Sequence, residues 1–127
     1  VRILAESATV EGGMLNIFGT GEDSYIENFR QEQKITFNFN ASLAGKYKMT
    51  IYYSANVNSG GGTVTFDLNG NKFDHEFAQT GGWAYYVYED LGEVELKAGR
   101  NTLILTDKEI PNTYLINVKN ISFEKID

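Results

Sequence analysis

The sequence predicts an all-β fold, an antiparallel β-sandwich of the jelly-roll type. Apolar and polar residues alternate from Lys34 to Ala41 and again from Lys46 to Ala55, which is the pattern of antiparallel strands with one wet face. Asn69-Gly70 separates two further segments of this kind and predicts a hairpin, because a tight primed turn needs positive φ at both central residues. About ten short segments with turns at regular spacing are typical of sandwiches and jelly rolls.

The predicted strands are separated by polar or glycine-rich connections. The segments 56–62 and 107–113 are expected to be loops. In the last strand the apolar positions change parity between Val118 and Ile121, which predicts a β-bulge near Asn120. In chain order the strands are predicted over Arg2–Ala8, Met14–Phe18, Ser24–Phe29, Lys34–Ala41, Lys46–Ala55, Thr63–Leu68, Lys72–Phe77, Trp83–Tyr88, Glu93–Leu96, Asn101–Thr106 and Tyr114–Lys125.

Length and charge narrow the function classes. A chain of 127 residues fits one domain, 1–127, with its own core; the chain does not begin with methionine, so we expect it to be a module of a larger protein. The net charge is -6, and without a Lys/Arg cluster we expect no nucleic-acid partner. No apolar run approaches the length of a membrane span, so no membrane partner is expected. A monomer that binds a neutral partner suits this surface best.

The stretch Thr80–Tyr88 is the most aromatic part of the chain and the main candidate for a binding site. It holds the only tryptophan and three of the eight tyrosines, directly after Gly81-Gly82. Glycine accepts backbone angles that are closed to other residues, so this pair predicts a loop that turns into a strand. Simple alternation places Trp83 with Tyr85 and Val87 on one face of that strand. These aromatic residues are interpreted either as core or as a platform for a flat apolar ligand.

Six stretches of the chain form an ordered set: Leu4-Ala5-Glu6 followed by Ala8-Thr9-Val10, then Asp23–Phe29, Ala44–Ile51, Val64–Gly70, Thr80-Gly81-Gly82-Trp83 and Val94–Leu103. Taken together in this order, they resemble carbohydrate-binding modules of families 6 and 35, with family 35 favoured. The resemblance implies a jelly-roll module of a secreted, extracellular bacterial enzyme, in which the module holds a covalently linked glycoside hydrolase on a polysaccharide.

A sugar site needs an aromatic face for the C–H-rich side of a pyranose and fixed donors and acceptors for its hydroxyls. The resemblance places the binding loops near Trp83 and in the 107–114 connection. The predicted ligand-binding residues are Trp83, Tyr25, Tyr85, Asn112 and Tyr114, and further polar candidates are Asn56, Asn58 and Thr113.

Two positions depart from the family pattern, in which acidic residues of the first and last strands hold a structural calcium ion. Leu4 stands where one of these acids is expected, and Lys119 stands where an aspartate is expected. We therefore expect no required cofactor, with Glu6 as a calcium ligand only if the site is retained. Two alternatives stay open for Lys119: it pairs with Glu6, a cation in place of a cation, or it points to solvent.

Nothing in the sequence indicates catalysis. His75 is the single histidine, so we expect a surface or packing residue. Acidic pairs for glycoside cleavage could be drawn from Glu22, Asp23, Glu89 and Asp90, but their interpretation as residues of solvated loops is favoured. The favoured function is non-catalytic binding of β-mannan, including glucomannan and galactomannan. The alternatives are xylan or uronic-acid-bearing glycans, a structural sandwich that packs on a neighbouring domain without a sugar ligand, and an all-β glycosidase or lyase.

Overall fold

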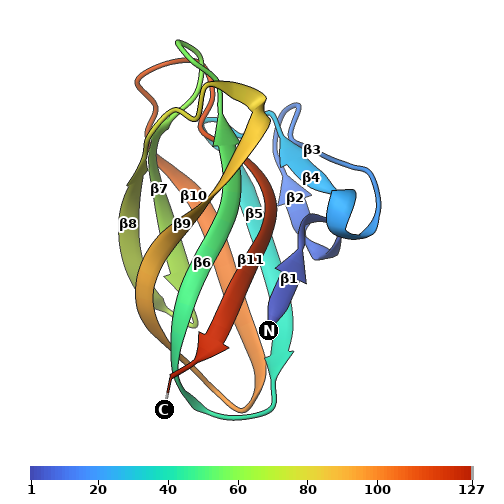
Figure 1. The fold of residues 1–127 in the computed structure, drawn as a ribbon, viewed down its shortest axis with the longest axis vertical. Coiled ribbons are helices and arrows are strands. Elements are labelled where there is room, and N and C mark those ends of the chain that lie inside the picture. The colour runs from blue at the N-terminus through green and yellow to red at the C-terminus, as the bar shows by residue number, and fades with distance from the viewer. Residues whose placement is uncertain (127) are drawn as a thin grey trace.

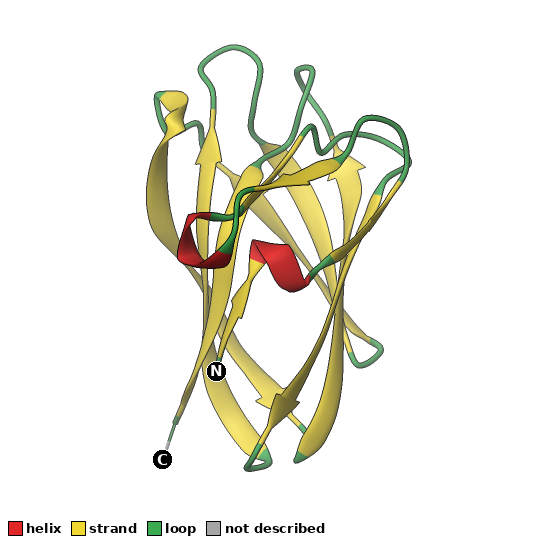
Figure 2. Cartoon of the chain, turned by 90° about the vertical axis from the view of Figure 1, so that its right-hand side faces the viewer, coloured by secondary structure: helices red, strands yellow, loops and turns green. Residues whose placement is uncertain are grey.

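Two antiparallel sheets face each other in the computed structural model, which describes residues 1–126 (Figures 1 and 2). The six-stranded sheet has the order β3 (Asn16–Phe18), β4 (Tyr25–Glu27), β11 (Asn117–Lys125), β6 (Gly45–Ala55), β9 (Gly82–Leu96), and β1 (Arg2–Leu4) also pairs with β11. The five-stranded sheet has the order β2 (Thr9–Glu11), β5 (Lys34–Ala41), β10 (Gly99–Glu109), β7 (Gly62–Leu68), β8 (Asn71–Phe77). The predicted antiparallel sandwich is confirmed. No helix within residues 1–126 is long and apolar enough to cross a membrane.

The core lies between the two sheets and follows the predicted alternation. In β5, Ile35 and Phe37 are fully buried, and in β6, Met49 and Ile51 are fully buried. Phe39 stacks on a ring from the opposite sheet, with its centroid 5.0 Å from that of Phe123. Each such side chain contributes about 1.5–3 kcal/mol on burial, so the alternation fixes which face of each strand turns inward.

The strongest turn prediction is also confirmed. Asn69 and Gly70 have φ values of 54° and 92° and join β7 to β8 as a tight hairpin. The predicted bulge is present as well, because the pairing of β11 with β6 changes register between Val118 and Asn120. The bulge turns Lys119 out of the regular alternation of β11.

The prediction of one strand over Arg2–Ala8 is wrong. β1 pairs with β11 in the six-stranded sheet, whereas β2 pairs with β5 in the five-stranded sheet. The chain therefore has to cross between the layers, and it does so through a single 3-10 turn, η1 (Ala5–Ser7). A second 3-10 turn, η2 (Gly21–Asp23), precedes β4, and both turns are visible in Figure 2.

The separate strands predicted over Trp83–Tyr88 and Glu93–Leu96 are one strand, β9, of 15 residues. Gly92, at φ 94°, bends this strand where its register against β6 shifts between Met49 and Thr50. A β-bulge at this position lets the strand continue through Gly92, where the sequence pattern predicted a turn between two strands. The predicted strands at 14–18, 24–29 and 114–125 are shorter at one or both ends in the structure.

The loops that carry the candidate site gather at one end of the sandwich, opposite the two termini (Figure 1). Three backbone hydrogen bonds tie these loops to one another and to β6: Thr80 N–H to Ala55 O at 2.8 Å, Gly61 N–H to Leu115 O at 2.8 Å, and Tyr114 N–H to Ser59 O at 2.8 Å. We call this end of the molecule the loop end.

Candidate functional site

The Thr80-Gly81-Gly82 turn is clamped onto the end of β6. The Thr80 hydroxyl accepts a hydrogen bond from Ala55 N–H at 3.0 Å, while Thr80 N–H donates to Ala55 O. Gly81 has φ 103°, a conformation that side chains rarely adopt. The Ser54 hydroxyl then donates to Trp83 O at 2.8 Å. The backbone that presents Trp83 is therefore held on both sides of the turn.

Side-chain packing fixes the indole of Trp83 in the same way. A Cβ placed at Gly60 would lie 3.0 Å from the Cη2 atom of Trp83, so glycine is needed for the loop to approach the ring. The Asn112 amide donates to Gly60 O at 3.0 Å and holds that loop in place. Tyr114 meets the indole edge-to-face at a centroid distance of 6.0 Å, and the Arg30 guanidinium lies 5.8 Å from the Tyr114 ring centroid.

A cavity of about 400 Å³ opens beside Trp83 on the outer face of the six-stranded sheet. Trp83 and Ala84 on β9 form one side, and Tyr25 and Glu27 on β4 form the other. We call this cavity the aromatic pocket. Its lining residues are Asp23, Tyr25, Glu27, Trp83, Ala84, Tyr86, Asn117 and Lys119.

The phenol of Tyr86 is partly buried in the lining of the pocket. Burial raises the pKa of Tyr86, and the neighbouring side chains of Ser54 and Asn117 offset part of the increase. Lys119, turned out by the bulge, places its Nζ 4.7 Å from the centroid of the Tyr86 ring. A cation over a ring face is a favourable electrostatic contact, and it keeps the ammonium group at the pocket.

Tyr25 is supported from behind in the same manner. Its ring stacks on Phe18 of β3, with centroids 5.7 Å apart and planes inclined by 22°. The direct pairing of Phe18 with Tyr25 across β3 and β4 places both on the outer face of the sheet. The pocket thus has an aromatic ring on each side, and both rings are braced by a second ring.

These groups can bind a polar molecule that has an apolar face. Aromatic rings remove the C–H surface of a sugar from water, and the Asn117 amide offers both a donor and an acceptor. Asp23 and Glu27 add acceptors, and Lys119 adds donors. The arrangement has no nucleophile next to an activating base, as acyl-transfer chemistry requires.

The structure brings together some of the predicted site residues and separates others. Tyr25 and Trp83 line the aromatic pocket, and Tyr114 packs behind Trp83. Tyr85 was expected on the same face as Trp83 but lies outside the pocket, 65% exposed, with its ring over Gly82. The reason is the register shift of β9 against β6 between Tyr53 and Ala55, which breaks the alternation at Trp83.

Asn112 was expected to contact the ligand directly, but it lies outside the aromatic pocket and holds the loop under Trp83. Asn56, another polar candidate, donates to the Ser59 hydroxyl at 3.0 Å and stabilises the same loop. Sequence reasoning missed Tyr86 and Asn117 as lining residues. Asn117 carried a usable signal, because it is a polar residue inside the apolar run Leu115–Val118.

The expected pairing of Glu6 with Lys119 is wrong. Glu6 Oε2 instead accepts a hydrogen bond from Gly21 N–H at 2.7 Å, while Lys119 lies over Tyr86. The positions that the family pattern assigns to calcium do not fit that ion here, because calcium takes 6–8 oxygen ligands and Leu4 and Lys119 supply none from their side chains. Within residues 1–126, no group of three or more histidine or acidic side chains is placed to hold a metal ion.

His75 is a packing residue, as expected. Its Nε2 lies 2.9 Å from Glu89 Oε2, which links the edge strands β8 and β9, and its ring meets Phe77 edge-on at 4.7 Å. Two further carboxylates considered for catalysis are paired elsewhere: Glu22 with Arg2 at 2.6 Å and Asp90 with Lys48 at 3.6 Å. Of the four, only Asp23 lines the aromatic pocket.

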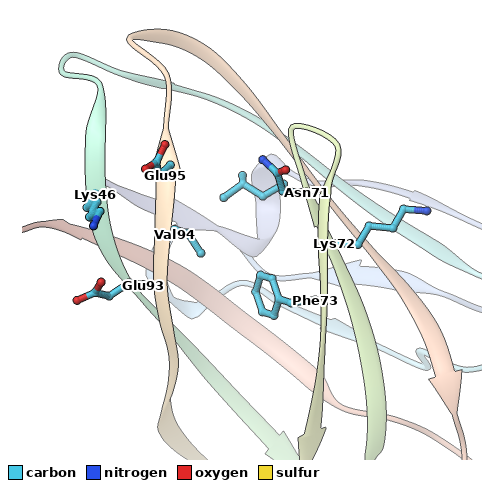
Figure 3. A pocket seen from close by; sticks show the side chains of 8 residues that line it. Lys46, Asn71, Lys72, Phe73, Glu93, Val94 and Glu95 are labelled. Carbon is cyan, nitrogen blue, oxygen red and sulfur yellow. The ribbon is translucent and has the colours of Figure 1, made fainter.

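A cleft of about 490 Å³ opens between β8 and β9 at the end opposite the loop end. Phe73 and Val94 point toward one another across it, whereas Lys72 and Glu93 point away (Figure 3). The cleft is the edge of the sandwich, where the two sheets diverge. Its lining holds one aromatic ring, that of Phe73, whereas three aromatic rings line the aromatic pocket, so the aromatic pocket is the better candidate for a ligand with an apolar face.

Comparisons with known proteins agree with this fold. A model of the family described as carbohydrate binding module (family 6) matches residues 5–125. A family 35 carbohydrate binding module from Clostridium thermocellum superposes with a TM-score of 0.80 at 22% identity, covering 98% of both chains. CBM35 from Paenibacillus barcinonensis gives a TM-score of 0.78 at 22% identity and covers 99% of both chains.

A third similar structure is a Podospora anserina GH26-CBM35 β-(1,4)-mannanase, with a TM-score of 0.68 at 21% identity. The match covers 100% of the present chain but 28% of the mannanase chain. A search of curated protein sequences finds no significant match. At these identities the similarity to solved structures shows the fold.

Proposed function

Because the chain belongs to carbohydrate-binding module family 6, we propose that it binds a plant cell-wall polysaccharide at the aromatic pocket without cleaving it. The observation that carries this proposal is one cavity lined by Tyr25 of β4 and Trp83 of β9, with Asn117 on β11, which lies between these two strands in the sheet. Two braced rings can hold the apolar faces of a pyranose, while the amide orients its hydroxyls. Module affinities from millimolar to micromolar correspond to about -4 to -8 kcal/mol, which a pocket of this kind can supply.

β-Mannan, including glucomannan and galactomannan, is the favoured ligand. The chain carries a net charge of -6, and Asp23 and Glu27 line the pocket, so a neutral polymer meets less repulsion than a charged one. The similarity to a module-bearing mannanase points to the same ligand class. One observation favours the alternative of uronic-acid-bearing glycans, because the ammonium group of Lys119 at the pocket could pair with a sugar carboxylate. Xylan, a neutral polymer in its unsubstituted form, remains the other candidate.

In this proposal the module is a monomeric, extracellular accessory domain of a glycoside hydrolase and raises the local concentration of the enzyme on its substrate. When the module binds the polysaccharide, the linked enzyme is held at a high effective concentration on the same polymer. This role requires no catalytic group in the module itself. A structural sandwich that packs on a neighbouring domain is the competing function. A polysaccharide-binding experiment separates the two.

Affinity electrophoresis in gels that contain mannan, xylan or polygalacturonate tests the proposal. The wild-type protein is expected to be retarded most by mannan. Trp83→Ala is expected to lose retardation, because one aromatic anchor is worth about 2 kcal/mol or more. Tyr85→Ala is the matched control, since Tyr85 is an exposed aromatic residue of the same strand that lies outside the pocket.

Thermal melting of each variant separates loss of binding from loss of fold. Trp83→Ala with lost retardation and a clear cooperative melt supports the proposal. Unchanged mobility of the wild-type protein in all three polysaccharides would favour the packing domain. Release of reducing sugars from the same soluble polysaccharides would instead indicate the glycosidase or lyase alternative.

A further inference from the structure

A row of side chains crosses the outer face of the six-stranded sheet at right angles to its strands. Phe18 pairs directly with Tyr25, and Tyr52 pairs directly with Tyr88. Ile26 pairs with Val118 and Asn120 with Tyr52, which places Lys119 between the two aromatic pairs. One residue from each of β3, β4, β11, β6 and β9 thus forms the row, whose members are Phe18, Tyr25, Lys119, Tyr52 and Tyr88. We call it the aromatic row.

The two ends of the aromatic row are exposed to solvent. Tyr88 is 64% exposed, and Phe18 is 42% exposed. Each end ring is held by its inner neighbour: Tyr88 stacks on Tyr52 with centroids 4.2 Å apart and an interplanar angle of 21°, and Phe18 stacks on Tyr25. Exposed apolar surface of this kind, when it is contiguous, marks a site of interaction.

The outer face of the five-stranded sheet is different. The outward positions of β5 are Lys34, Thr36, Asn38 and Asn40, and those of β8 include Lys72, Asp74 and Glu76. Outward-facing aromatic residues therefore gather on the sheet that also carries the aromatic pocket. This asymmetry indicates a function for the row beyond strand pairing.

The aromatic row is continuous with the pocket. Tyr25 and Lys119 belong to both, and Tyr52 contacts Tyr86 of the pocket with ring centroids 5.5 Å apart. Beyond the Tyr88 level the face becomes charged, where Lys48 and Asp90 form an ion pair at 3.6 Å. Tyrosine rings have an apolar face and a polar hydroxyl, so they suit a partner with an apolar surface on one side and solvated hydroxyl groups on the other.

We infer that the bound polysaccharide does not end in the aromatic pocket but continues along the aromatic row, with Tyr88 and Phe18 as outer platforms. The inference rests on the proposed function. Four interstrand steps of about 4.8 Å give the row a length of roughly 19 Å, which an oligosaccharide can span and a monosaccharide cannot. A site that is open at both ends accepts internal segments of a chain, so the module recognises the body of the polymer rather than its terminus.

Isothermal titration calorimetry with β-1,4-mannobiose and β-1,4-mannohexaose tests this inference, with xylobiose and xylohexaose in parallel. In whichever of the two series, mannose or xylose, binds more tightly, the wild-type protein should bind the hexasaccharide about tenfold more tightly than the disaccharide. This difference in affinity equals about 1.4 kcal/mol. Tyr88→Ala should remove most of that difference and leave disaccharide binding unchanged. Tyr85→Ala, which deletes an equally exposed ring of β9 outside the row, should alter neither affinity. Thermal melting checks that both variants are folded.

The outcomes distinguish this inference from the function on which it rests. Equal affinity of the wild-type protein for the two lengths, or a Tyr88→Ala variant with unchanged hexasaccharide affinity, would overturn the extended site and leave the pocket as the sugar site. Such a result would assign the row to a neighbouring domain or a second copy of the chain. No binding of any of the four oligosaccharides would overturn mannan and xylan as ligands of the pocket together with this inference.

Discussion

The indole of Trp83 and the ring of Tyr114 meet edge-to-face, with centroids 6.0 Å apart and planes inclined by 80°. This geometry is the one that aromatic quadrupoles favour. Because Tyr114 also lies beside the Arg30 guanidinium, it fills the space between the indole and a charged group of the neighbouring loop. Trp83 is therefore held in place before any ligand arrives, which reduces the entropy lost on binding.

Replacement of Tyr114 should reveal this support. Tyr114→Ala is expected to weaken polysaccharide binding by about 0.5–1.5 kcal/mol, the typical worth of an aromatic pair beyond its buried area. Tyr114→Phe keeps the ring and should bind as the wild-type protein does. Calorimetric titration with mannohexaose compares the three proteins, and an equal loss in both variants would show that the hydroxyl, rather than the ring contact, matters.

Replacement of two asparagines should distinguish a residue that contacts the ligand from a residue that only stabilises the neighbouring loop. Asn117 lines the aromatic pocket and is buried, whereas Asn112 is exposed and donates to Gly60 O. Asn117→Ala is expected to cost about 1–3 kcal/mol of binding free energy, because it leaves sugar hydroxyls without partners. Asn112→Ala removes one partly buried hydrogen bond outside the pocket and should cost about 0.5 kcal/mol. Affinity measured by titration checks the order, and a larger loss for Asn112→Ala would move the site toward the 107–114 loop.

The fold could be predicted from the sequence wherever one strand face is buried. Alternation in Lys34–Ala41 and Lys46–Ala55 identified the inward residues, because a slip of one position would expose the whole apolar set. The split of Arg2–Ala8 between two sheets could not be predicted, since three-residue strands carry too little periodicity. The boundary between β1 and β2 depends on which distant strand each one pairs with, and the local sequence pattern holds no information about these partners.

The candidate site was harder to predict because bulges decide its geometry. Trp83 and Tyr25 could be found from residue type and loop context alone. Tyr85 and Tyr86 exchanged their expected roles, since a register shift in β9 reverses the parity of Trp83. Lys119 was singled out in the sequence as a departure from the calcium pattern of the family, and the bulge in β11 places it over the Tyr86 ring.

Calcium removal should leave the stability of this protein unchanged. Leu4 and Lys119 provide no side-chain oxygen for a cage, and Glu6 is engaged by Gly21 N–H. Calcium bound only to the native state would add about 2.7 kcal/mol at a hundredfold excess over its Kd. Thermal melting with calcium and with a chelator should therefore give the same midpoint. A fall of several degrees in the chelator would show that other oxygen atoms complete a calcium site.

Stability should fall in strongly alkaline solution. Burial raises the pKa of both Tyr53 and Tyr86, and the charge of Glu89 adds to the effect on Tyr53. The folded state thus favours the neutral phenols, so their contribution is full below the unfolded pKa of about 10 and is lost as the pH rises through the raised folded pKa. Melting temperatures measured on either side of about pH 10 should show this loss, and Tyr86→Phe should reduce it. An undiminished loss in Tyr86→Phe would assign the effect to other groups.

Trp83 is the only tryptophan of the chain, so its fluorescence reports on the aromatic pocket without interference from another indole. The most direct test of the sugar site is a fluorescence titration of the wild-type protein with mannohexaose, with calorimetry on the same samples. A saturable change in the Trp83 emission, with the same Kd as the calorimetric curve, is the predicted result. Calorimetric binding that leaves the Trp83 emission unchanged would contradict the account, because the polysaccharide would then bind away from this ring.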